Sequence, residues 1–213
     1  MEHLERYYRF QSAIYDATRW LFLFGRGRIV DRLATACPSP SRLVEIGCGT
    51  GHTLCGLAKR FPSAQITGID LSPDMLAIAR RKTARFGARV SLRQEVQRDS
   101  LEEGYDGVLF SYSLSMMNPG WDRVLDSAVE ALAPGGVLAA VDFHTTPSSL
   151  FRTHMGHHHV RMDGHLLPAL KSRLRMDSTA VRPAYCGLWT WFEFVGWKPF
   201  QEPGSAGSGE RRS

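Results

Sequence analysis

The sequence predicts an α/β protein whose core is a doubly wound, mostly parallel β-sheet. From residue 42 onward, short apolar runs alternate with stretches of helical periodicity, which is the pattern of strand–helix–strand units. The first apolar run ends at a glycine-rich loop, residues 47–51, and a helical stretch follows it directly. We therefore expect a sheet with helices on both faces. The length of 213 residues suits one such domain with a small appendage.

The first 36 residues are expected to be helical and to precede the sheet. Gly25 and Gly27 loosen the pattern, and Pro38 and Pro40 end it. Apolar side chains recur at spacings of three and four and form one stripe of a helix: Tyr7, Phe10, Ile14, Ala17, Leu21 and Phe24. A stripe of this kind commonly marks the face that a helix buries.

The remaining elements follow in chain order. Ser72 is a typical helix N-cap, and Pro73 stands in the first turn, where proline is tolerated. The apolar runs predict strands and the periodic stretches predict helices: strands over 43–47, 65–70, 89–93, 105–111 and 137–143, and helices over 52–61, 73–86 and 121–132. Two later strands, 178–182 and 188–197, are expected to pair at one edge of the sheet. We expect a helical N-terminal segment (1–40), the α/β domain (41–200) and a flexible glycine- and serine-rich tail (201–213).

Composition and charge exclude several classes of protein. Hydrophobic residues make up 43% and charged residues 22% of the chain, which is ordinary for a globular protein. No apolar run reaches the 18 or so residues that a membrane-spanning helix needs. The N-terminus carries acids where a signal peptide has a basic region, and the four cysteines show no framework spacing. We therefore expect a cytoplasmic protein with reduced thiols.

The sharpest motif is the loop Glu45-Ile46-Gly47-Cys48-Gly49-Thr50-Gly51, between a predicted strand and a predicted helix. Glycines allow a tight turn and let a ligand approach the backbone, and ligands of open α/β sheets lie at the carboxyl ends of the strands. Dinucleotide-binding loops read GxGxxG, but His52 stands where the third glycine would be. The chain also lacks a GxxxxGK[ST] phosphate-binding loop. These departures disfavour a ligand held by its phosphates.

Two acidic residues follow the next strands. Asp70 ends the second predicted strand, where a carboxylate can accept hydrogen bonds from both hydroxyls of a ribose. Glu95 follows the third strand, near the same crevice. Two acids beside a glycine loop suit a nucleoside that is positively charged and lacks phosphates, and S-adenosylmethionine is such a ligand.

At this point the sequence resembles the class I S-adenosylmethionine-dependent methyltransferases, which have a Rossmann-like fold. The resemblance covers residues 42 to about 144 and includes the ExGCGTG loop and the Pro134-Gly135-Gly136 turn before the fifth strand. It implies S-adenosylmethionine as the cofactor and the following cofactor-binding residues: Glu45, Gly47, Cys48, Gly49, Gly51, Asp70, Leu71, Met75, Glu95, Val96 and Ser111.

The resemblance also implies a role for each group. The loop glycines surround the methionine part of the cofactor, Glu45 orients its amino group, and Asp70 binds the ribose. Leu71 and Met75 flank the adenine, and Glu95 matches the acid near the adenine amino group. The family often has Gly-Asp-Ala where this chain has Gln-Glu-Val at 94–96, so the sequence departs from the pattern there.

A narrower resemblance, to bacterial enzymes of betaine-lipid synthesis, covers nearly the whole chain. It is carried by four segments: residues 8–20 (YRFQSAIYDATRW), 111–116 (SYSLSM), 141–143 (VDF) and 163–170 (DGHLLPAL). These enzymes methylate the amino group of diacylglyceryl-homoserine three times. Related enzymes acting on phosphatidylethanolamine share much of the pattern. A methyltransferase for a soluble amine or a quinone precursor, and a binding module without catalysis, remain alternatives.

Methyl transfer to an amine suggests catalytic candidates. Tyr15 is expected to face the site from an N-terminal lid, and both Tyr15 and Tyr112 are expected to offer an aromatic face to the methylated, cationic product. His144, after the fifth strand, is expected to accept a proton or contact the head group. No metal is expected, although histidines cluster in one segment: His154, His157, His158 and His159.

The basic residues suggest where the protein works. The net charge is +5 and the cations are nearly all arginines, with four lysines. The densest run, residues 80–93, lacks the interleaved aromatic residues that stack on bases, so no nucleic-acid partner is expected. The expected partners are a lipid at the inner face of the membrane, reached by reversible docking, and the enzyme that makes the homoserine lipid.

Overall fold

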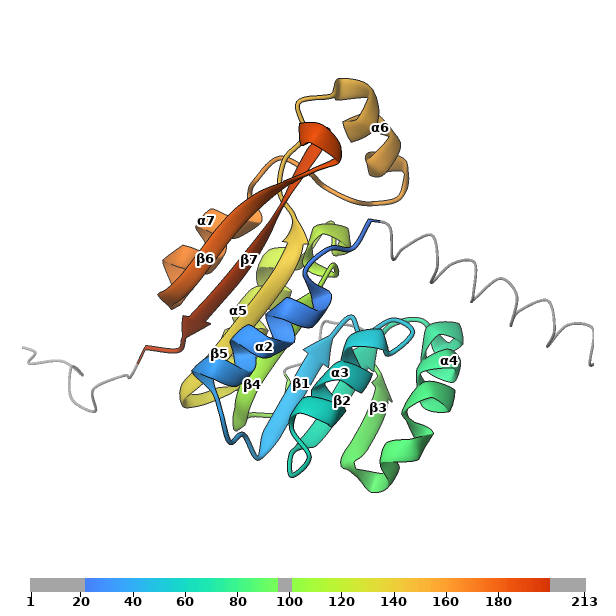
Figure 1. Ribbon diagram of the computed structural model, residues 1–213, viewed down its shortest axis with the longest axis vertical. Helices are drawn as coiled ribbons and strands as arrows, with labels where there is room; N and C mark the ends of the chain where they lie inside the picture. Colours follow the sequence, from blue (N-terminus) through green and yellow to red (C-terminus); the bar gives the residue numbers. More distant parts are fainter. Residues whose placement is uncertain (1–21, 96–100, 200–213) are drawn as a thin grey trace, which may run out of the picture.

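The computed structural model describes residues 22–95 and 101–199, which form one seven-stranded mixed sheet with flanking helices (Figure 1). The strand order is β3-β2-β1-β4-β5-β7-β6. The first five strands of that order are parallel, and β7 is antiparallel to both β5 and β6. The strands are β1 (Arg42–Ile46), β2 (Gln65–Asp70), β3 (Val90–Gln94), β4 (Tyr105–Ser111), β5 (Leu132–Phe143), β6 (Arg175–Ala184) and β7 (Trp189–Trp197).

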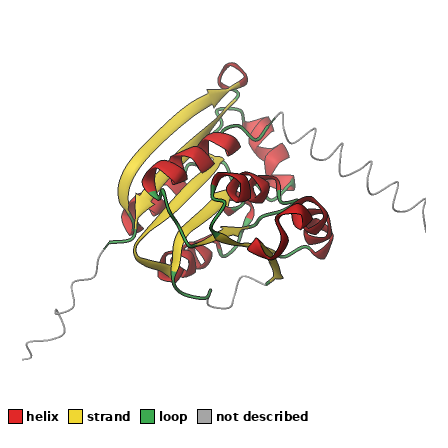
Figure 2. Ribbon diagram, turned by 60° about the horizontal axis from the view of Figure 1, so that its bottom comes forward, coloured by secondary structure: helices red, strands yellow, loops and turns green. Residues whose placement is uncertain are grey.

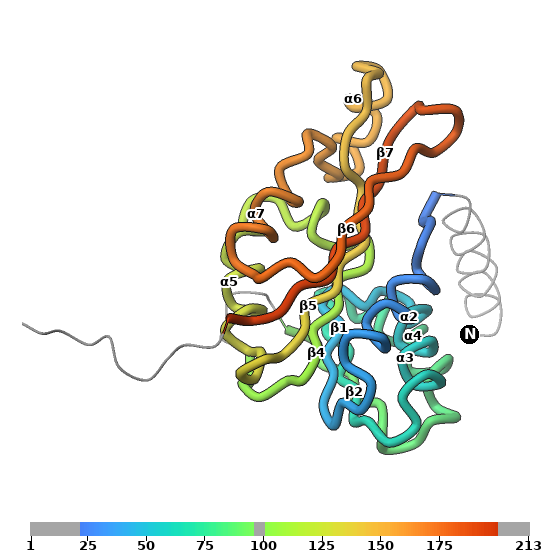
Figure 3. The backbone as a smooth tube through the Cα atoms, turned by 60° about the vertical axis from the view of Figure 1, so that its left-hand side comes forward, coloured from blue at the N-terminus to red at the C-terminus, as the bar shows by residue number. Residues whose placement is uncertain are grey.

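Helices cover the two faces of the sheet in separate groups, as the nearly edge-on view in Figure 3 shows. One face carries α2 (Arg26–Ala36), α3 (His52–Arg60) and α4 (Pro73–Thr83), and the other carries α5 (Trp121–Ala131) and α7 (Leu166–Arg173). Each group buries its apolar stripe against the strands, which gives two core clusters. The short helix α6 (Ser149–His157) buries none of its residues and lies beyond the sheet.

At β2 and β3, the described residues place helices on one face of the sheet only. Residues 95–104 join β3 to β4, and their described part contains no helix. Thr67 and Ser91 pair in register on the face that α5 and α7 cover elsewhere, and their hydroxyls hydrogen-bond at 3.2 Å. Arg93, two residues further along this face, pairs with Glu102 at 2.7 Å. Because this part of the sheet faces water, its side chains are polar where those of β1 are apolar.

The long antiparallel pair β6–β7 extends the sheet on the other side (Figure 2). Glu193 of β7 is fully buried and lies at the centre of a cluster of arginines. Its Oε1 is 2.5 Å from Nε of Arg28, and its Oε2 is 3.4 Å from Arg32 and 3.8 Å from Arg182. Since Arg28 and Arg32 belong to α2, this carboxylate ties α2 to the hairpin.

The predicted strands and helices are confirmed with small changes at their ends. The helix expected to reach residue 86 ends at Thr83 and continues as a 3₁₀ turn to Arg89, where Gly87 breaks the helical conformation. The fifth strand begins at Leu132, five residues earlier than expected. α2 belongs to the main core through Ile29 and Leu33. The rest of the predicted lid, residues 1–21, and the predicted tail from residue 200 lie outside the described residues.

Within the described ranges, no helix combines the length and the apolar character needed to cross a bilayer.

We predict that Glu193→Ala lowers the free energy of unfolding by about 1–3 kcal/mol, because it leaves the arginines of α2 and β6 without their buried partner. Urea denaturation of the two proteins measures the difference. Glu102→Ala is the control, since Glu102 pairs with Arg93 at the exposed surface, where ion pairs contribute little. Equal losses of unfolding free energy in both variants would contradict a stabilising role for the buried carboxylate of Glu193.

Candidate functional site

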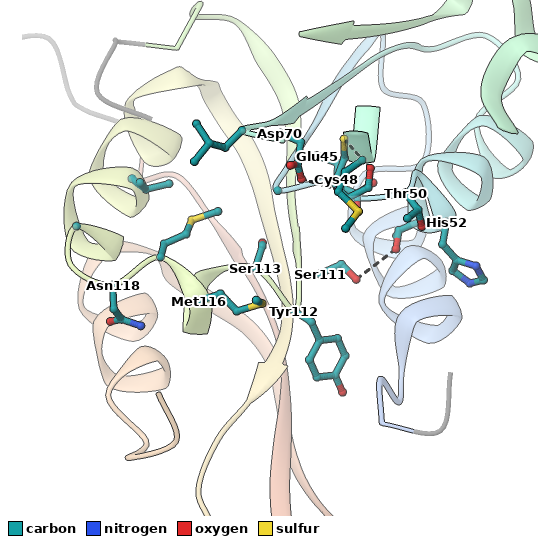
Figure 4. A pocket seen from close by; sticks show the side chains of 18 of the residues that line it. Glu45, Cys48, Thr50, His52, Asp70, Ser111, Tyr112, Ser113, Met116 and Asn118 are labelled. Atoms are coloured by element: carbon teal, nitrogen blue, oxygen red, sulfur yellow. Dashed lines mark hydrogen bonds between the residues drawn. The ribbon is translucent and has the colours of Figure 1, made fainter. Parts of the chain in front are cut away.

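A cavity of about 910 Å³ lies where the carboxyl ends of β1, β2 and β4 meet. Figure 4 shows Glu45, Cys48 and Asp70 on one side of it and Met116 and Asn118 on the opposite side. Parallel strands place all their carboxyl ends at one edge of the sheet, so residues far apart in sequence converge there. The cavity is large enough for a nucleoside-sized ligand together with part of a second molecule.

The glycine loop after β1 is shaped by close packing. The backbone N–H groups of Gly47 and Cys48 both donate to the carbonyl of Ile69, at 2.8 and 2.9 Å, which ties the loop to the end of β2. Gly47 has φ +72°, and a Cβ there would lie 2.4 Å from Cβ of Ser113. Gly49 has φ +52° with open space in front of it, so its backbone is accessible to a ligand.

Asp70 holds two loops at the edge of the cavity. Its Oδ2 accepts a hydrogen bond from the N–H of Gly49 at 2.7 Å, and its Oδ1 accepts one from the N–H of Ser72 at 2.9 Å. A carboxylate has about four acceptor positions, so these two bonds leave capacity for ligand hydroxyls. Asp70 therefore fixes the loop and also presents acceptors to the cavity.

Glu45 is a buried acid at the base of the cavity. It is only 1% exposed, and burial raises its pKa to about 8, against the opposing effect of the Arg26 guanidinium. Its Oε2 is buried and has no hydrogen-bond partner among the described residues. Such an atom is costly unless a ligand satisfies it, and an ammonium group would do so. The donor set thus fits a ligand with an amino group near Glu45 and hydroxyls near Asp70.

Tyr112, directly after β4, is held in a strained backbone conformation with φ +56°. Its hydroxyl donates a hydrogen bond to the carbonyl of Phe24 at 2.8 Å, and its ring packs edge-on against Phe143 at 4.8 Å. Burial raises the pKa of this phenol well above its ordinary value. Tyr112 therefore stays protonated and contributes an aromatic surface, and it ties the segment before α2 to the cavity.

The loop after Tyr112 forms the opposite wall and was not predicted as part of the site. Asn118 donates from Nδ2 to the carbonyl of Ser115 at 2.7 Å, and the N–H of Ser115 donates to the buried carboxylate of Asp142 at 3.1 Å. Burial raises the pKa of Asp142 to about 6. The sequence did mark Asp142 as unusual, because it is an acid inside the apolar run of β5. It did not reveal that the partner of Asp142, Ser115, follows β4.

The structure brings nine of the predicted residues together around the cavity: Glu45, Gly47, Cys48, Gly49, Asp70, Leu71, Met75, Ser111 and Tyr112. Gly51 instead begins α3, and a Cβ there would meet Ala79 of α4 at 3.0 Å. Glu95 does not line the cavity, and its Oε1 lies 3.9 Å from Arg93. Tyr15 and Val96 lie outside the described residues.

His144 also lies away from the cavity lining. Its ring packs edge-on against Phe192 at 6.0 Å, its Nδ1 has no partner among the described residues, and burial lowers its pKa. The proposed roles of His144 and Glu95 thus remain predictions without a contact to the cavity. In the described ranges, no three histidine, cysteine or acidic side chains gather as metal ligands. His154 and His158 contact one another, at 5.1 Å between ring centres.

Known proteins give a consistent picture. Residues 44–138 match the family described as a methyltransferase domain. The chain is 31% identical over 147 residues to demethylmenaquinone methyltransferase of Thermus thermophilus, covering 64% of each chain. It is 35% identical over 130 residues to trans-aconitate 2-methyltransferase of Methylobacterium nodulans, covering 60% of this chain and 49% of that one. The chain therefore spans about half to two thirds of the length of these two relatives.

Solved structures agree on the fold. The N-methyltransferase NodS from Bradyrhizobium japonicum, in complex with S-adenosyl-L-homocysteine, superposes with a TM-score of 0.68 at 21% identity, covering 82% of this chain and 86% of that one. Together with the strand order, the match to this structure shows the Rossmann-like fold that class I S-adenosylmethionine-dependent methyltransferases have, and residues 44–138 match a methyltransferase domain. The buried carboxylate of Glu45 and the acceptors of Asp70 fit that cofactor.

We predict that Asp70→Ala weakens binding of S-adenosylhomocysteine about 100-fold, because the variant loses both the ribose acceptors and the anchor of the glycine loop. Isothermal titration calorimetry measures the affinity, and circular dichroism verifies folding. Asp74→Asn, an exposed acid of α4, is the control and should bind normally. Unchanged affinity in folded Asp70→Ala would overturn the ribose assignment.

A second prediction concerns the pH dependence of stability in the ligand-free protein. The pKa of Glu45 is raised on folding, so the folded state binds its proton more tightly, and ionisation destabilises it as the pH rises from about 5 to about 8. Glu45→Gln removes this penalty. The variant should be more stable than the wild type by a few kcal/mol at pH 8, and the difference should shrink at pH 5. Urea denaturation at both values tests this, and a pH-independent difference would contradict it.

Proposed function

We propose that this protein is an S-adenosylmethionine-dependent N-methyltransferase that trimethylates the amino head group of a membrane lipid, diacylglyceryl-homoserine in particular, to give a betaine lipid. The observation that carries the methyltransferase part is the single cavity that Glu45, the glycine loop and Asp70 line together, in which Oε2 of Glu45 has no hydrogen-bond partner among the described residues. The lipid part rests on the resemblance of the N-terminal, 111–116 and 163–170 segments to betaine-lipid enzymes.

The cofactor, when bound, supplies a methyl group on a positively charged sulfur. Glu45 would pair with the amino group of its methionine part, and Asp70 would accept hydrogen bonds from its ribose. The loop glycines let the ligand approach the backbone. The side chain of Cys48 is 5% exposed and packs between the loop and Gly68 of β2. These contacts would fix the direction of the methyl group, which is the main requirement of an in-line displacement.

The acceptor amine would enter on the side of Tyr112 and the Ser113–Gly120 loop. A neutral amine would take the methyl group that the cofactor supplies, and its proton would leave to solvent. Each transfer would add one methyl group to the nitrogen, and the third would leave a permanent positive charge. The ring of Tyr112 and the thioethers of Met116 and Met117 line this side, and such polarisable groups favour a cation that has no N–H to donate.

The alternative acceptors are other amino lipids such as phosphatidylethanolamine, or a soluble amine or quinone precursor. A quinone acceptor draws support from the relative named for demethylmenaquinone, and a small acceptor in general from the relative named for trans-aconitate. We propose a cytoplasmic protein that associates peripherally with the inner face of the membrane, near the enzyme that supplies the homoserine lipid.

The purified protein with S-adenosylmethionine should convert diacylglyceryl-homoserine in mixed micelles into products heavier by one, two and three methyl groups. Lipid mass spectrometry follows the series, phosphatidylethanolamine and a soluble amine serve as competing acceptors, and Asp70→Ala serves as the inactive control. Methylation of the soluble amine alone would refute the lipid assignment while leaving the methyltransferase assignment intact. No turnover with any acceptor, despite tight cofactor binding, would favour a binding module.

A further inference from the structure

Four exposed apolar side chains form one patch at the end of the molecule, where α6 meets the turn between β6 and β7. We call this patch the apolar tip; its residues are Phe22, Leu150, Tyr185 and Leu188. Leu150 is 83% exposed and the other three are 39–49% exposed. Single exposed apolar residues are common, but several at one protruding end of the molecule indicate a contact surface.

The apolar tip rests on a rigid base of stacked rings. Trp189 is 1% exposed and lies at the centre of the stack. Phe151 of α6 stacks on it at 5.1 Å, Phe22 stacks on it at 5.4 Å, and Tyr185 contacts it at 4.8 Å. Thr146 also donates a hydrogen bond to the carbonyl of Leu188 at 2.7 Å, which fixes the turn against the start of α6. The exposed side chains are therefore held in place before any partner binds.

The charge around the apolar tip is predominantly positive. The three segments that build it, residues 22–30, 144–162 and 178–192, contain no aspartate or glutamate and five arginines: Arg26, Arg28, Arg152, Arg161 and Arg182. Two acids border these segments: Glu193 is buried and lies near Arg28 and Arg182, and Asp163 pairs with Arg161. An apolar tip set among cations is complementary to a bilayer that contains anionic lipids, because the apolar groups enter the interface and the arginines meet the head groups.

The position of the apolar tip matches the position of the cavity. α6 and the β6–β7 turn project beyond the carboxyl ends of the parallel strands, as Figures 1 and 3 both show. The cavity lies at these same strand ends. A membrane that contacted the tip would therefore face the edge of the sheet at which the acceptor enters.

We propose that the apolar tip is a membrane-docking surface that inserts Leu150, Tyr185 and Leu188 into the interface of an anionic bilayer. This inference deepens the proposed function, since it explains how the enzyme reaches an amino lipid. Docking itself requires neither the cofactor nor methyl transfer, so the two proposals are tested separately.

The test is co-sedimentation of the whole chain with two kinds of vesicle. One kind contains phosphatidylcholine alone, and the other also contains about 40% phosphatidylglycerol, which makes it strongly anionic. The wild type should bind the anionic vesicles, and added salt should weaken binding. Leu150→Ser with Leu188→Ser should lower the partition coefficient at least about tenfold, because two buried leucines are lost from the interface. Met176→Ser, an equally apolar exposed site of β6 far from the turn, should change it less than about twofold.

The affinity for S-adenosylhomocysteine should be the same in all these proteins, which shows that the fold and the cavity are intact. Three results would overturn the docking proposal: no binding of the wild type, equal binding of the double variant, or a wild-type dimer that the double variant dissociates in sedimentation velocity. Vesicle binding without methylation of any amino lipid would support docking and reject the acceptor. Methylation of an amino lipid in detergent without vesicle binding would support the acceptor and reject docking.

Discussion

The carboxylate of Glu45 is the constraint around which the rest of the site is arranged. A β-strand at the centre of a sheet normally buries apolar side chains, and Glu45 stands in β1 among Leu43, Val44 and Ile46, which are all buried. Burial raises its pKa, so the folded chain bears a cost for keeping an acid there. A cation that binds in the cavity offsets this cost. The position is thus unfavourable for stability alone and favourable for a ligand with an ammonium group.

The neighbouring contacts keep the space in front of Glu45 open. Ser113 donates from its hydroxyl to the carbonyl of Ile46 at 2.8 Å, and its Cβ occupies the volume that a side chain at Gly47 would need. Asp142 holds the same loop from β5, through the N–H of Ser115. The wall opposite the glycine loop is therefore fixed by residues from β4 and β5, so the cavity is formed largely before the ligand arrives.

Local sequence patterns predicted the strand ends, and hence most of the cofactor side of the site. Asp70 was identified because it ends an apolar run, and all parallel strands place their carboxyl ends at the same edge of the sheet. Glu45 was identified through the resemblance of the loop that follows it to the class I methyltransferases. The contacts that the sequence did not predict join segments that are far apart in the chain. Glu193 meets Arg28 across 165 residues and Tyr112 meets Phe24 across 88, and no periodicity encodes such pairs. The polar face of β3 was not predicted for a similar reason, because what covers a strand depends on segments outside it.

These long-range contacts connect the cavity with the outer end of the molecule. The hydroxyl of Tyr112 holds the carbonyl of Phe24, and the ring of Phe24 stacks on Trp191 at 6.2 Å. Glu193, two residues further along β7, holds Arg28 and so fixes the beginning of α2. The segment that enters α2 is thus bound at one side to Tyr112, which lines the cavity, and at the other to the β6–β7 hairpin. Tyr112 and the hairpin are therefore joined through the short stretch of backbone between Phe24 and Arg28.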